Sequence, residues 1–596
     1  MQRARHAAVF EAPVVVRAYA RPFVVAYRRW PLYVHGRLAS TSSSEIQNVA
    51  VLGGGITGLT TAYYLTRSYP HAKVTVYEAS GRLGGWVRSR RLEIPESDGA
   101  QVLFEEGPRT LRPRGNGVAV RGLISQLDLK SEILALPKSA PAAQNRFIYY
   151  PDHLVLLPTG ATLANSGGTF RTEKLFHDAF PSVLRFAWHM ARFTFSWQPP
   201  RADDESIGDF ITRHVGPGPA DHFASAVAHG IWAGDIWQLS MKSLFTRPWA
   251  LTKRYKNALQ AASAMQEGKA GHGPVLREYV GKHLQQGWGD RDFLNELRPA
   301  SVFYFKGGME TLTKRLEELL RANLKVEIRT GAPVEQISKT EDRSALQVTV
   351  KSSESQPQPQ SPQAFSRVIS TLPALTLSSL CPSPSSSTTS LLPALASIPS
   401  ATVMTINLYF RTPNLVPPGF GYLLPQTISL EQNPERALGV VFDSFASPGL
   451  DDTTRAQHAA FGTKLTVMLG GHWWQGLKGV PNEEEGVDMA RGILKRHLGI
   501  EEEPAVANAR AHRDCIPQYL VGHDDQLVEA GKQLKAEFGN MLRVAGSSYL
   551  GVGVADCVLN AWAVVEGLRE DDRNGLSEWA GRRDELEVVE GAEGVI

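Results

Sequence analysis

A run of glycines directly after a short apolar segment constrains the fold of this chain more than any other feature. Val49–Leu52 is apolar enough to be a buried strand, and glycines crowd positions 53–58 immediately after it. Ile56–Ser68 then carries apolar residues at helical spacing, and Lys73–Tyr77 alternates like a second strand. Strand, glycine turn, helix and strand in this order predict a βαβ unit, which starts a doubly wound parallel sheet of the α/β class.

Each glycine of the Gly-x-Gly-x-x-Gly pattern has a physical task beside a phosphate. Gly53 permits the tight turn, Gly55 lets the backbone approach a pyrophosphate, and Gly58 lets helix and strand pack closely. The free N–H groups and the dipole of the following helix favour negative charge at its N-terminus. Glu78 ends the second strand, where a carboxylate accepts ribose hydroxyls and repels a 2′-phosphate. The sequence therefore predicts a dinucleotide site, not for NADP, at Gly53, Gly54, Gly55, Ile56, Thr57, Gly58 and Glu78.

A second glycine-rich stretch, Arg82–Trp86, follows the second strand. Its two glycines allow another close backbone approach, and Arg82 can neutralise phosphate charge. An Arg-x-Gly-Gly stretch in this place is typical of the flavin amine-oxidase-like superfamily, so the predicted cofactor is non-covalent FAD. Near the C-terminus, small residues precede a helix expected from about Asp556 to Leu568, whose N-terminus would stabilise negative charge on a reduced flavin.

The first 44 residues have the composition of a targeting segment. Seven of the chain's 63 basic residues and one of its 60 acidic residues lie there, so the remainder has a formal charge of −3. An Arg-rich, acid-poor segment predicts a mitochondrial transit peptide, with a disordered basic arm as the alternative. The acidic remainder argues against nucleic-acid binding. Cys381, Cys515 and Cys557 have no metal-ligand spacing, so neither a metal site nor a disulfide framework is expected.

An aromatic and basic block spans about 175–197. It reads either as an amphipathic helix packed on a core or as an interfacial membrane helix. No uncharged apolar run reaches 18 residues, so no transmembrane helix is expected. The low-complexity segments 353–363 and 382–390 are predicted to be mobile surface loops, and the tail after Glu570 is predicted to be poorly ordered.

Further motifs, in chain order, resemble the protoporphyrinogen oxidase family. They are Val49–Gly58, Glu78, Arg82–Trp86, Phe104–Arg109, Ala142–Phe147, Phe305–Glu310, Gly419–Gly421, Val467–Gly471, Cys515–Tyr519 and Gly546–Val554. The resemblance runs from about residue 48 to 568 and leaves out the leader, the low-complexity segments and the tail. The N-terminal motifs are shared across the flavin superfamily, whereas the later ones narrow the resemblance to this family.

The resemblance implies an activity in haem biosynthesis. The family oxidises protoporphyrinogen IX to protoporphyrin IX at FAD, with O2 as electron acceptor and H2O2 as by-product. The substrate is a flat apolar macrocycle with two propionates, so its pocket should be apolar with a cationic anchor. The resemblance also implies peripheral attachment to the mitochondrial inner membrane, with the intermembrane-space face expected. It leaves open a homodimer and a contact with ferrochelatase.

The resemblance also implies roles for single residues. On the flavin side these are Ala79, Trp86, Gly107, Pro108, Arg109, Thr110, Val334, Val552, Gly553 and Val554, beside the residues already named. On the substrate side they are Arg146 as propionate anchor, Phe420, Leu423 and Met468 as pocket wall, and Gly230 near the substrate ring. No catalytic acid or base is predicted. Position 229 is histidine where animal members of the family carry arginine, so a solvated or structural histidine is expected there.

The motifs divide the chain into predicted domains. A Rossmann-like FAD domain is assembled from 46–140, 300–350 and 505–570, a helical membrane-facing domain occupies 145–295, a mixed-sheet substrate domain occupies 350–500, and 571–596 is a tail.

Two other classes of protein share the N-terminal motifs, so two alternative functions stay open. One is a flavin oxidase acting on amines or polyenes, and the other is a non-catalytic escort-type binder of the same fold without FAD.

Overall fold

The computed structural model describes most of the chain after the N-terminal leader. The described residues are 46–157, 174–180, 183–195, 197, 200, 202–266, 271–285, 291–351, 361–383, 386–449, 462–477, 479–569, 573–576, 579–582 and 585. The predicted transit peptide, residues 1–44, and most of the first low-complexity segment lie outside them.

A five-stranded parallel sheet forms where the βαβ unit is predicted. Its order is β21-β13-β1-β2-β9, and every neighbouring pair is parallel. The strands are β1 (Asn48–Leu52), β2 (Lys73–Tyr77), β9 (Val326–Arg329), β13 (Arg367–Ser370) and β21 (Leu542–Val544). The sheet is therefore assembled from segments spread over almost 500 positions of the chain.

Helices cover both faces of this sheet. Val49 and Val51 of β1 lie in the core formed with α1 (Ile56–Ser68), α15 (Glu310–Arg321) and α21 (Val554–Glu566). Ala50 and Leu52 lie instead in the core formed with α16 (Ala374–Ser379), α17 (Pro393–Ala396) and α20 (His523–Phe538). Successive side chains of a strand point to opposite faces, which is why an uninterrupted apolar run suits a strand covered on both sides.

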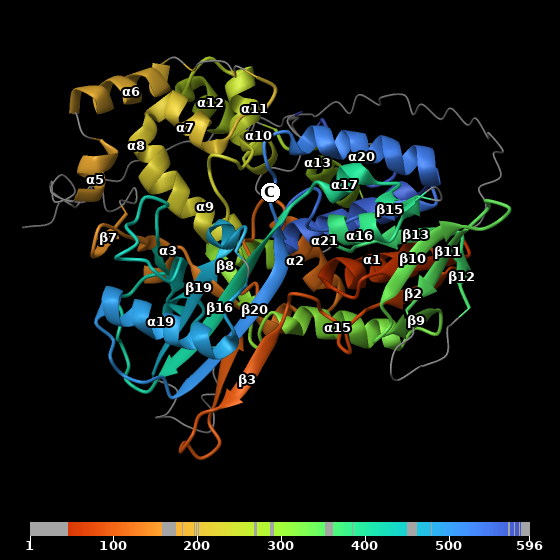
Figure 1. Ribbon diagram of the computed structural model, residues 1–596, viewed down its shortest axis with the longest axis horizontal. Helices are drawn as coiled ribbons and strands as arrows, with labels where there is room; N and C mark the ends of the chain where they lie inside the picture. Colours follow the sequence, from red (N-terminus) through yellow and green to blue (C-terminus); the bar gives the residue numbers. More distant parts are fainter. Residues whose placement is uncertain are drawn as a thin grey trace, which may run out of the picture. The chain divides into compact units, whose positions relative to one another are not determined.

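A seven-stranded mixed sheet forms the second core. Its order is β20-β16-β19-β18-β17-β6-β7, antiparallel except for the parallel pair β17–β6. The strands are β6 (Phe147–Tyr149), β7 (Leu154–Leu156), β16 (Ser400–Phe410), β17 (Gly421–Leu423), β18 (Ala437–Val441), β19 (Thr463–Gly470) and β20 (Val506–Pro517). Helix α19 (Glu483–Leu498) covers one face (Figure 1), packing Ala490, Ile493 and Leu494 against it.

A helical region lies between β7 and β8 in the sequence. Its helices are α5 (Lys174–Ala179), α6 (Val183–Phe195), α7 (Ile207–Val215), α8 (Pro217–Pro219), the π-helix η3 (Ala220–Ala224), α9 (Ser225–Trp232), α10 (Met241–Leu244), α11 (Thr246–Arg254), α12 (Ala258–Gln266), α13 (Pro274–Gln285) and α14 (Arg291–Glu296). Several of them, including α5, α6, α7 and α12, gather on one side of the two sheets in Figure 1.

Smaller elements complete the described fold. The remaining strands are β3 (Ser89–Glu93), β4 (Gln101–Glu105), β5 (Ile133–Pro137), β8 (Ala300–Phe305), β10 (Val334–Lys339), β11 (Leu346–Val350), β12 (Gln363–Phe365), β14 (Pro382–Ser383) and β15 (Ser386–Ser390). The remaining helices are α2 (Gly117–Gln126), η1 (Lys130–Glu132), α3 (Pro141–Gln144), α18 (Asp443–Ala446), η4 (Gly471–Trp474) and η5 (Gly567–Arg569).

The two sheets do not follow the predicted domain ranges at their edges. β6 and β7 lie within the range predicted as helical, and β20 lies within the last FAD range, yet all three belong to the seven-stranded sheet. β13 lies within the predicted substrate range and pairs with β1. The domain ranges themselves stay a prediction.

The second low-complexity segment departs from its prediction as a mobile loop. β14 and β15 pair antiparallel, and the Ser390 hydroxyl donates to the Ser378 carbonyl (2.7 Å). Short polar side chains supply such local hydrogen bonds to the backbone. Cys381 and Leu392, which flank the segment, are fully buried and anchor its ends. The described part of this segment therefore pairs as two short strands between buried anchors.

The described tail residues also correct a prediction. Leu576 is fully buried and Trp579 nearly so, whereas the tail was expected to be poorly ordered. The Val544 N–H donates to the Asn574 carbonyl (3.0 Å), which holds this part of the tail against β21. Two apolar side chains and one sheet-edge hydrogen bond are enough to fix a segment whose overall composition is polar.

Candidate functional site

The glycine pattern stands at the C-terminal end of β1. Gly53 has a φ of +100°, and its N–H donates to the Tyr77 carbonyl (2.8 Å), which turns the chain from strand to helix. A Cβ on Gly58 would lie 1.8 Å from the Gly53 carbonyl oxygen, so only glycine allows this packing of α1 on β1. Gly55 caps α1 with no side-chain hydrogen bond, and the first turn holds no acidic residue. The first N–H groups of α1 are therefore available to an anion.

Glu78 faces the glycine turn from the end of β2. One carboxylate oxygen accepts from the Gly54 N–H and the other from the Ser80 N–H, both at 2.8 Å. These bonds fix the carboxylate and leave lone pairs for further donors such as ribose hydroxyls. Ala79 is exposed beside it. The Ala332 N–H donates to the Glu78 carbonyl (2.9 Å), and this brings the segment leading to Val334 to the same place.

The Arg82–Trp86 stretch packs on the glycine turn through backbone contacts. The Gly84 N–H donates to the Gly54 carbonyl (2.8 Å), and a Cβ on Gly85 would lie 3.0 Å from the Gly55 Cα. The Arg82 guanidinium donates to the Leu83 and Gly85 carbonyls and lies 3.7 Å from Glu310. Arg82 thus braces this loop, and direct contact with a phosphate stays a prediction. Trp86 is 44% exposed, with its ring edge-on to His512.

The Gly107–Thr110 segment runs beside this stretch. A Cβ on Gly107 would lie 2.1 Å from the Trp86 carbonyl oxygen, so a glycine is required here too. Arg109 turns away to Asp443, with 2.7 Å between guanidinium and carboxylate and both side chains largely buried. Its direct role is therefore to join this segment to α18. Thr110 lines a cavity that Gly553 and Val554 also line. Flavin contacts by Gly107, Pro108, Arg109 and Thr110 stay predictions.

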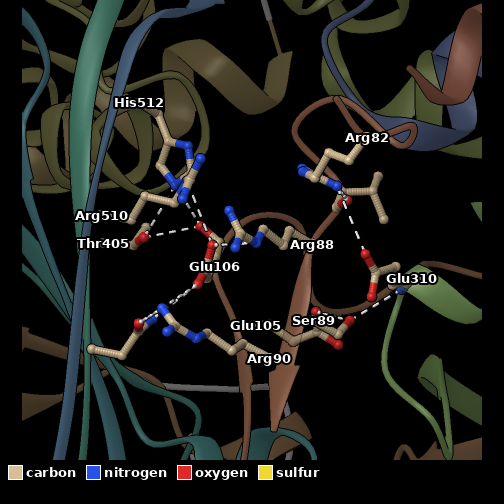
Figure 2. Close-up of polar contacts among 12 residues, drawn as sticks. Arg82, Arg88, Ser89, Arg90, Glu105, Glu106, Glu310, Thr405, Arg510 and His512 are labelled. Carbon is tan, nitrogen blue, oxygen red and sulfur yellow. Dashed lines mark hydrogen bonds and ion pairs between the residues drawn. The ribbon is translucent and has the colours of Figure 1, made fainter. Parts of the chain in front are cut away.

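Glu106, just before this segment, is the centre of an ionic cluster that the sequence did not predict. Its side chain is 1% exposed. Figure 2 shows Arg88, Arg90 and Arg510 converging on its carboxylate, at 3.2, 3.8 and 3.5 Å. One buried carboxylate thus meets three guanidiniums, which leaves this place with a surplus of positive charge.

The Glu106 backbone is held as firmly as its side chain. The Thr405 hydroxyl and the His512 Nε2–H both donate to the Glu106 carbonyl, at 2.9 and 2.7 Å (Figure 2). A carbonyl only accepts, so the proton of neutral His512 lies on Nε2. Burial lowers the pKa of His512, which keeps it neutral. Strands β16 and β20 are thereby joined to the chain that leads into Gly107.

The N-terminus of α21 completes the predicted flavin side. Gly553 caps this helix, and its N–H donates to Asp556 (3.0 Å). Gly551 has a φ of +135°, a conformation that favours glycine. Helices α1 and α21 pack directly on each other. Residues 552–554 therefore lie on an element that contacts the glycine-pattern helix, although their flavin contacts stay predictions.

Two of the three predicted pocket-wall residues, Leu423 and Met468, lie in one row of the seven-stranded sheet. Leu423 pairs with Gly439, Gly439 with Met468, and Met468 with Thr405. Residues in register on neighbouring strands point to the same face, which is here the face opposite α19. A Cβ on Gly439 would lie 2.8 Å from the Leu423 side chain, so Leu423 packs directly over this glycine. Gly439 was not among the predicted site residues, although a glycine within an apolar strand often marks a close approach.

Gly230 and Arg146 flank this row from other elements. A Cβ on Gly230 would lie 2.7 Å from Leu423, so α9 packs closely on β17. The Arg146 guanidinium lies over the Phe420 ring at 5.1 Å, just ahead of β6 and β17. Burial and the nearby charge of Arg112 lower the pKa of Arg146. The five predicted substrate residues thus come from two strands, β17 and β19, two segments beside the sheet and one helix.

The face of α9 that carries Gly230 holds two further apolar side chains. Val227 and Ile231 are 37% and 45% exposed, and their four-residue spacing places them on one side of the helix. Neither was among the predicted site residues. The helical spacing with Gly230 was the available signal, but it does not separate a ligand-facing side from a core-facing one.

His229 is structural and not solvated. It is 2% exposed, and its Nδ1–H donates to the Leu424 carbonyl (2.6 Å). Its Nε2 therefore accepts, from the His472 Nε2–H at 2.8 Å. Burial first, and then the neighbouring His472, lower the pKa of His229 to about 3. Where an arginine would carry a charge, this chain has a neutral histidine pair.

This pair predicts a loss of stability in acid. The unfolded chain takes up a proton on histidine below about pH 6.5, whereas folded His229 resists protonation down to about pH 3. The free energy of unfolding should therefore fall as the pH drops from 6.5 toward 3. Denaturant titrations of the wild type and of His229→Gln over this range measure the effect, and the variant should lose less stability. The same change at exposed His71 should leave the curve unaltered; parallel curves for wild type and His229→Gln would refute the assignment.

Comparison with known proteins identifies the family. The model of the flavin containing amine oxidoreductases matches residues 56–568. The chain is 32% identical over 534 residues to protoporphyrinogen oxidase of Schizosaccharomyces pombe, covering 87% of this chain and 98% of the relative. It is 33% identical over 520 residues to the protein of that name from Bos taurus, covering 86% and 96%. The chain belongs to the protoporphyrinogen oxidase family of flavin-containing amine oxidoreductases.

Solved structures confirm the predicted fold. A bacterial protein from Exiguobacterium sp. 255-15 superposes with a TM-score of 0.64 at 21% identity, covering 88% of this chain and 98% of that one. Reduced UDP-galactopyranose mutase superposes with a TM-score of 0.56 at 14% identity, covering 91% and 100%. The α/β class with a flavin amine-oxidase-type FAD domain is thus confirmed.

The cofactor of the family fits the residues present. FAD, as predicted, is the cofactor of this oxidoreductase. Gly53, Gly58 and Gly107 each lie where a Cβ would clash with the chain's own atoms, so only glycine allows the close packing of the segments predicted to surround the cofactor. Glu78 offers an oriented carboxylate for ribose hydroxyls, and the uncapped start of α1 offers N–H donors for a pyrophosphate.

Proposed function

We propose that this chain oxidises protoporphyrinogen IX to protoporphyrin IX. Six hydrogens leave the macrocycle, and three O2 molecules take them up as three H2O2. The observation that carries the proposal is the identity of 32–33%, over almost their whole length, with relatives named protoporphyrinogen oxidase. The rival functions, a flavin oxidase of amines or polyenes and a binder without FAD, share only the N-terminal motifs.

The site residues suit a flat apolar dicarboxylate. Leu423 and Met468 lie beside Gly439 on one face of the sheet, and Gly230 allows α9 to pack closely on Leu423. Arg146 has no ion-pair partner among the described residues, so its guanidinium is free to take a propionate in a bidentate manner. The Phe420 ring beneath it holds the guanidinium plane in place.

Bound FAD would supply the hydride acceptor. Residues 53–58 and Glu78 would hold its diphosphate and ribose, with Ala79 and Val334 beside them. Trp86, residues 107–110 and residues 552–554 would hold the ring system. The start of α21 would stabilise negative charge on it through backbone N–H groups and the helix dipole.

No side chain is proposed as catalytic acid or base. Removal of hydride from a meso carbon leaves a pyrrole N–H proton, which water can accept. The protein's part is to orient the macrocycle and to exclude water from its apolar faces.

Arg146→Ala is expected to raise the KM for protoporphyrinogen by about tenfold to a hundredfold, because a charge-assisted pair with a propionate is lost. FAD content should stay at the wild-type ratio, since Arg146 contacts no predicted flavin residue. Steady-state kinetics and flavin absorbance per protein measure the two quantities. Arg146→Lys should recover part of the loss. Loss of FAD with an unchanged KM would overturn the propionate role.

The function itself is tested by adding protoporphyrinogen IX to the purified protein under air. Growth of porphyrin fluorescence with stoichiometric H2O2 is expected. Turnover of amines without a porphyrin signal would favour the flavin oxidase of amines. A protein that stays colourless when FAD is added would favour the binder without a cofactor.

A mitochondrial location is proposed from the composition of residues 1–44, with peripheral attachment to the inner membrane and its intermembrane-space face. None of the helices within the described residues is long and apolar enough to span a membrane. Helix α6 exposes Leu184, Trp188 and Phe195 at 84%, 56% and 66%, and Arg192 lies over the Trp188 ring. Exposed aromatics beside basic groups suit a lipid interface. A homodimer and a contact with ferrochelatase stay predictions.

A further inference from the structure

A cavity of about 720 Å³ opens beside the predicted flavin segments. Its walls come from residues 110–117, 243–248, 272–276 and 550–560. This volume lies within the range of about 300–1,000 Å³ found for small-molecule sites. None of the five predicted substrate residues lines it. The cavity is therefore separate from the row at Gly439.

Four basic side chains line this cavity: Arg112, Arg114, Arg247 and His272. Among the described residues none of the three arginines has a carboxylate within ion-pair distance. The charge of Arg247 contributes, after burial, to a lowered pKa of His272, so these two groups lie near each other. The cavity thus holds a surplus of positive charge.

Asp556 is the one carboxylate among the lining residues. One of its oxygens accepts from the Asn116 side chain (2.7 Å) and the other from the Gly553 N–H (3.0 Å). These hydrogen bonds hold the start of α21 in place, and the single charge of Asp556 offsets at most one of the three arginines. An anionic ligand is what this arrangement lacks.

The rest of the lining is apolar. Leu244, Phe245, Leu276 and Leu559 contribute to it. A small inorganic anion would leave these surfaces in contact with water, whereas a ligand with an apolar body and carboxylates would cover them. The lining therefore favours an amphiphilic carboxylate.

Two features connect the cavity to the proposed reaction site. Thr110, Gly553 and Val554 line it and are predicted flavin contacts. The charge of Arg112 contributes, after burial, to a lowered pKa of Arg146, so the predicted propionate anchor and a guanidinium of the cavity are within electrostatic reach.

We propose that this cavity is a second binding site for the tetrapyrrole dicarboxylate, held through its propionates by Arg114 and Arg247 with Arg112 between the two sites. The inference rests on the proposed function, because that function supplies a ligand with an apolar body and two carboxylates. The macrocycle would be oxidised in the site at Arg146 and would occupy the cavity before or after that oxidation.

The test is an equilibrium titration of the FAD-loaded protein with protoporphyrin IX, followed by fluorescence quenching. Two binding events are expected. In Arg114→Gln/Arg247→Gln the affinity of one event should fall about tenfold or more, while the other stays unchanged. Arg146→Ala should weaken the other event alone. Arg298→Gln, an exposed arginine outside the cavity, is the matched control and should change neither.

Two probes identify the chemistry. Protoporphyrin dimethyl ester, which lacks the carboxylates, should lose the Arg114/Arg247-dependent event. Inorganic phosphate at the same concentration should not compete with that event; full competition would mean a general anion site and overturn the tetrapyrrole assignment. Flavin content and melting temperature of each variant show that it is folded.

A single binding event in the wild type, or an unchanged second affinity in Arg114→Gln/Arg247→Gln, would overturn the inference. Its failure differs from failure of the proposed function. A protein that oxidises protoporphyrinogen and binds one porphyrin keeps the function and loses the second site. A protein that binds two porphyrins and oxidises none keeps the sites and loses the function.

Discussion

Gly58→Ala is expected to leave the purified protein without FAD and to lower its free energy of unfolding by about 3 kcal/mol or more. The added Cβ would lie 1.8 Å from the Gly53 carbonyl oxygen, which belongs to the backbone and cannot rotate away. Either the turn after β1 or the start of α1 must move. Because the start of α1 is the predicted pyrophosphate site, the same movement removes the cofactor site. Flavin absorbance per protein and denaturant unfolding measure the two losses.

Gly81→Ala is the matched control for this prediction. Gly81 lies in the neighbouring glycine-rich stretch, but a Cβ there meets no atom within 4 Å. FAD content and unfolding should stay at wild-type values. Wild-type FAD content in Gly58→Ala would show that the close packing at this glycine is not needed for the cofactor.

The βαβ unit could be predicted from sequence because its parts are local. Ile56–Ser68 and Lys73–Tyr77 are a helix and a strand with those same bounds in the structure. The turn between strand and helix is set by glycines a few residues apart, β1 is a mostly apolar run and β2 alternates polar and apolar residues. Local periodicity and turn residues were therefore enough to predict the βαβ unit, without knowing which other strands pair with it.

The remaining strands of that sheet could not be predicted in this way. β13 joins β1 from more than 300 positions away, and β21, almost 500 positions after β1, joins β13. Parallel pairing leaves no turn signal in the sequence, since the connection is a long crossover. β20 lies in the predicted FAD range although it pairs antiparallel with β16; β17, β18 and β19 separate the two strands in the sequence, so no hairpin turn marks their pairing.

The site residues differ in the same way: those fixed by a local motif could be predicted, and those that depend on long-range packing could not. Glu78 was found because it stands at a fixed place after a strand, and its contact with the Gly54 N–H agrees with that place. His229 and His472 lie 243 positions apart in the sequence, and no sequence pattern predicts that they form a hydrogen bond. Arg109 was assigned to the flavin, but its ion pair with Asp443 depends on how α18 packs, which the motif does not encode.

Glu106→Gln is expected to lower the free energy of unfolding by about 3 kcal/mol, the lower end of the range for breaking a buried ion pair. The lower end applies because Arg88, Arg90 and Arg510 are 29%, 46% and 37% exposed, so water screens part of their mutual repulsion. Glutamine keeps the volume and removes the charge that the three guanidiniums share. Denaturant unfolding at neutral pH measures the loss.

Two further variants separate charge from shape in this cluster. Glu501→Gln removes the carboxylate of an exposed pair with Lys495 (3.0 Å) and should cost no more than about 1 kcal/mol. Adding Arg510→Gln to Glu106→Gln removes one unbalanced charge and should restore part of the lost stability. Equal losses in Glu106→Gln and Glu501→Gln would show that the buried carboxylate contributes no more than a surface one.

The Glu106 cluster should also affect the cofactor, because its backbone carbonyl is the link between strands β16 and β20 and the chain entering Gly107. Repulsion among the arginines in Glu106→Gln would displace Arg510 and, two residues on along the same strand, His512. The Gly107–Thr110 segment would then lose one of the two hydrogen bonds that fix its start. FAD should therefore dissociate more readily from Glu106→Gln than from the wild type, and partly recover in the variant that also carries Arg510→Gln. Unchanged FAD affinity alongside the expected loss of stability would confine the cluster to a structural role.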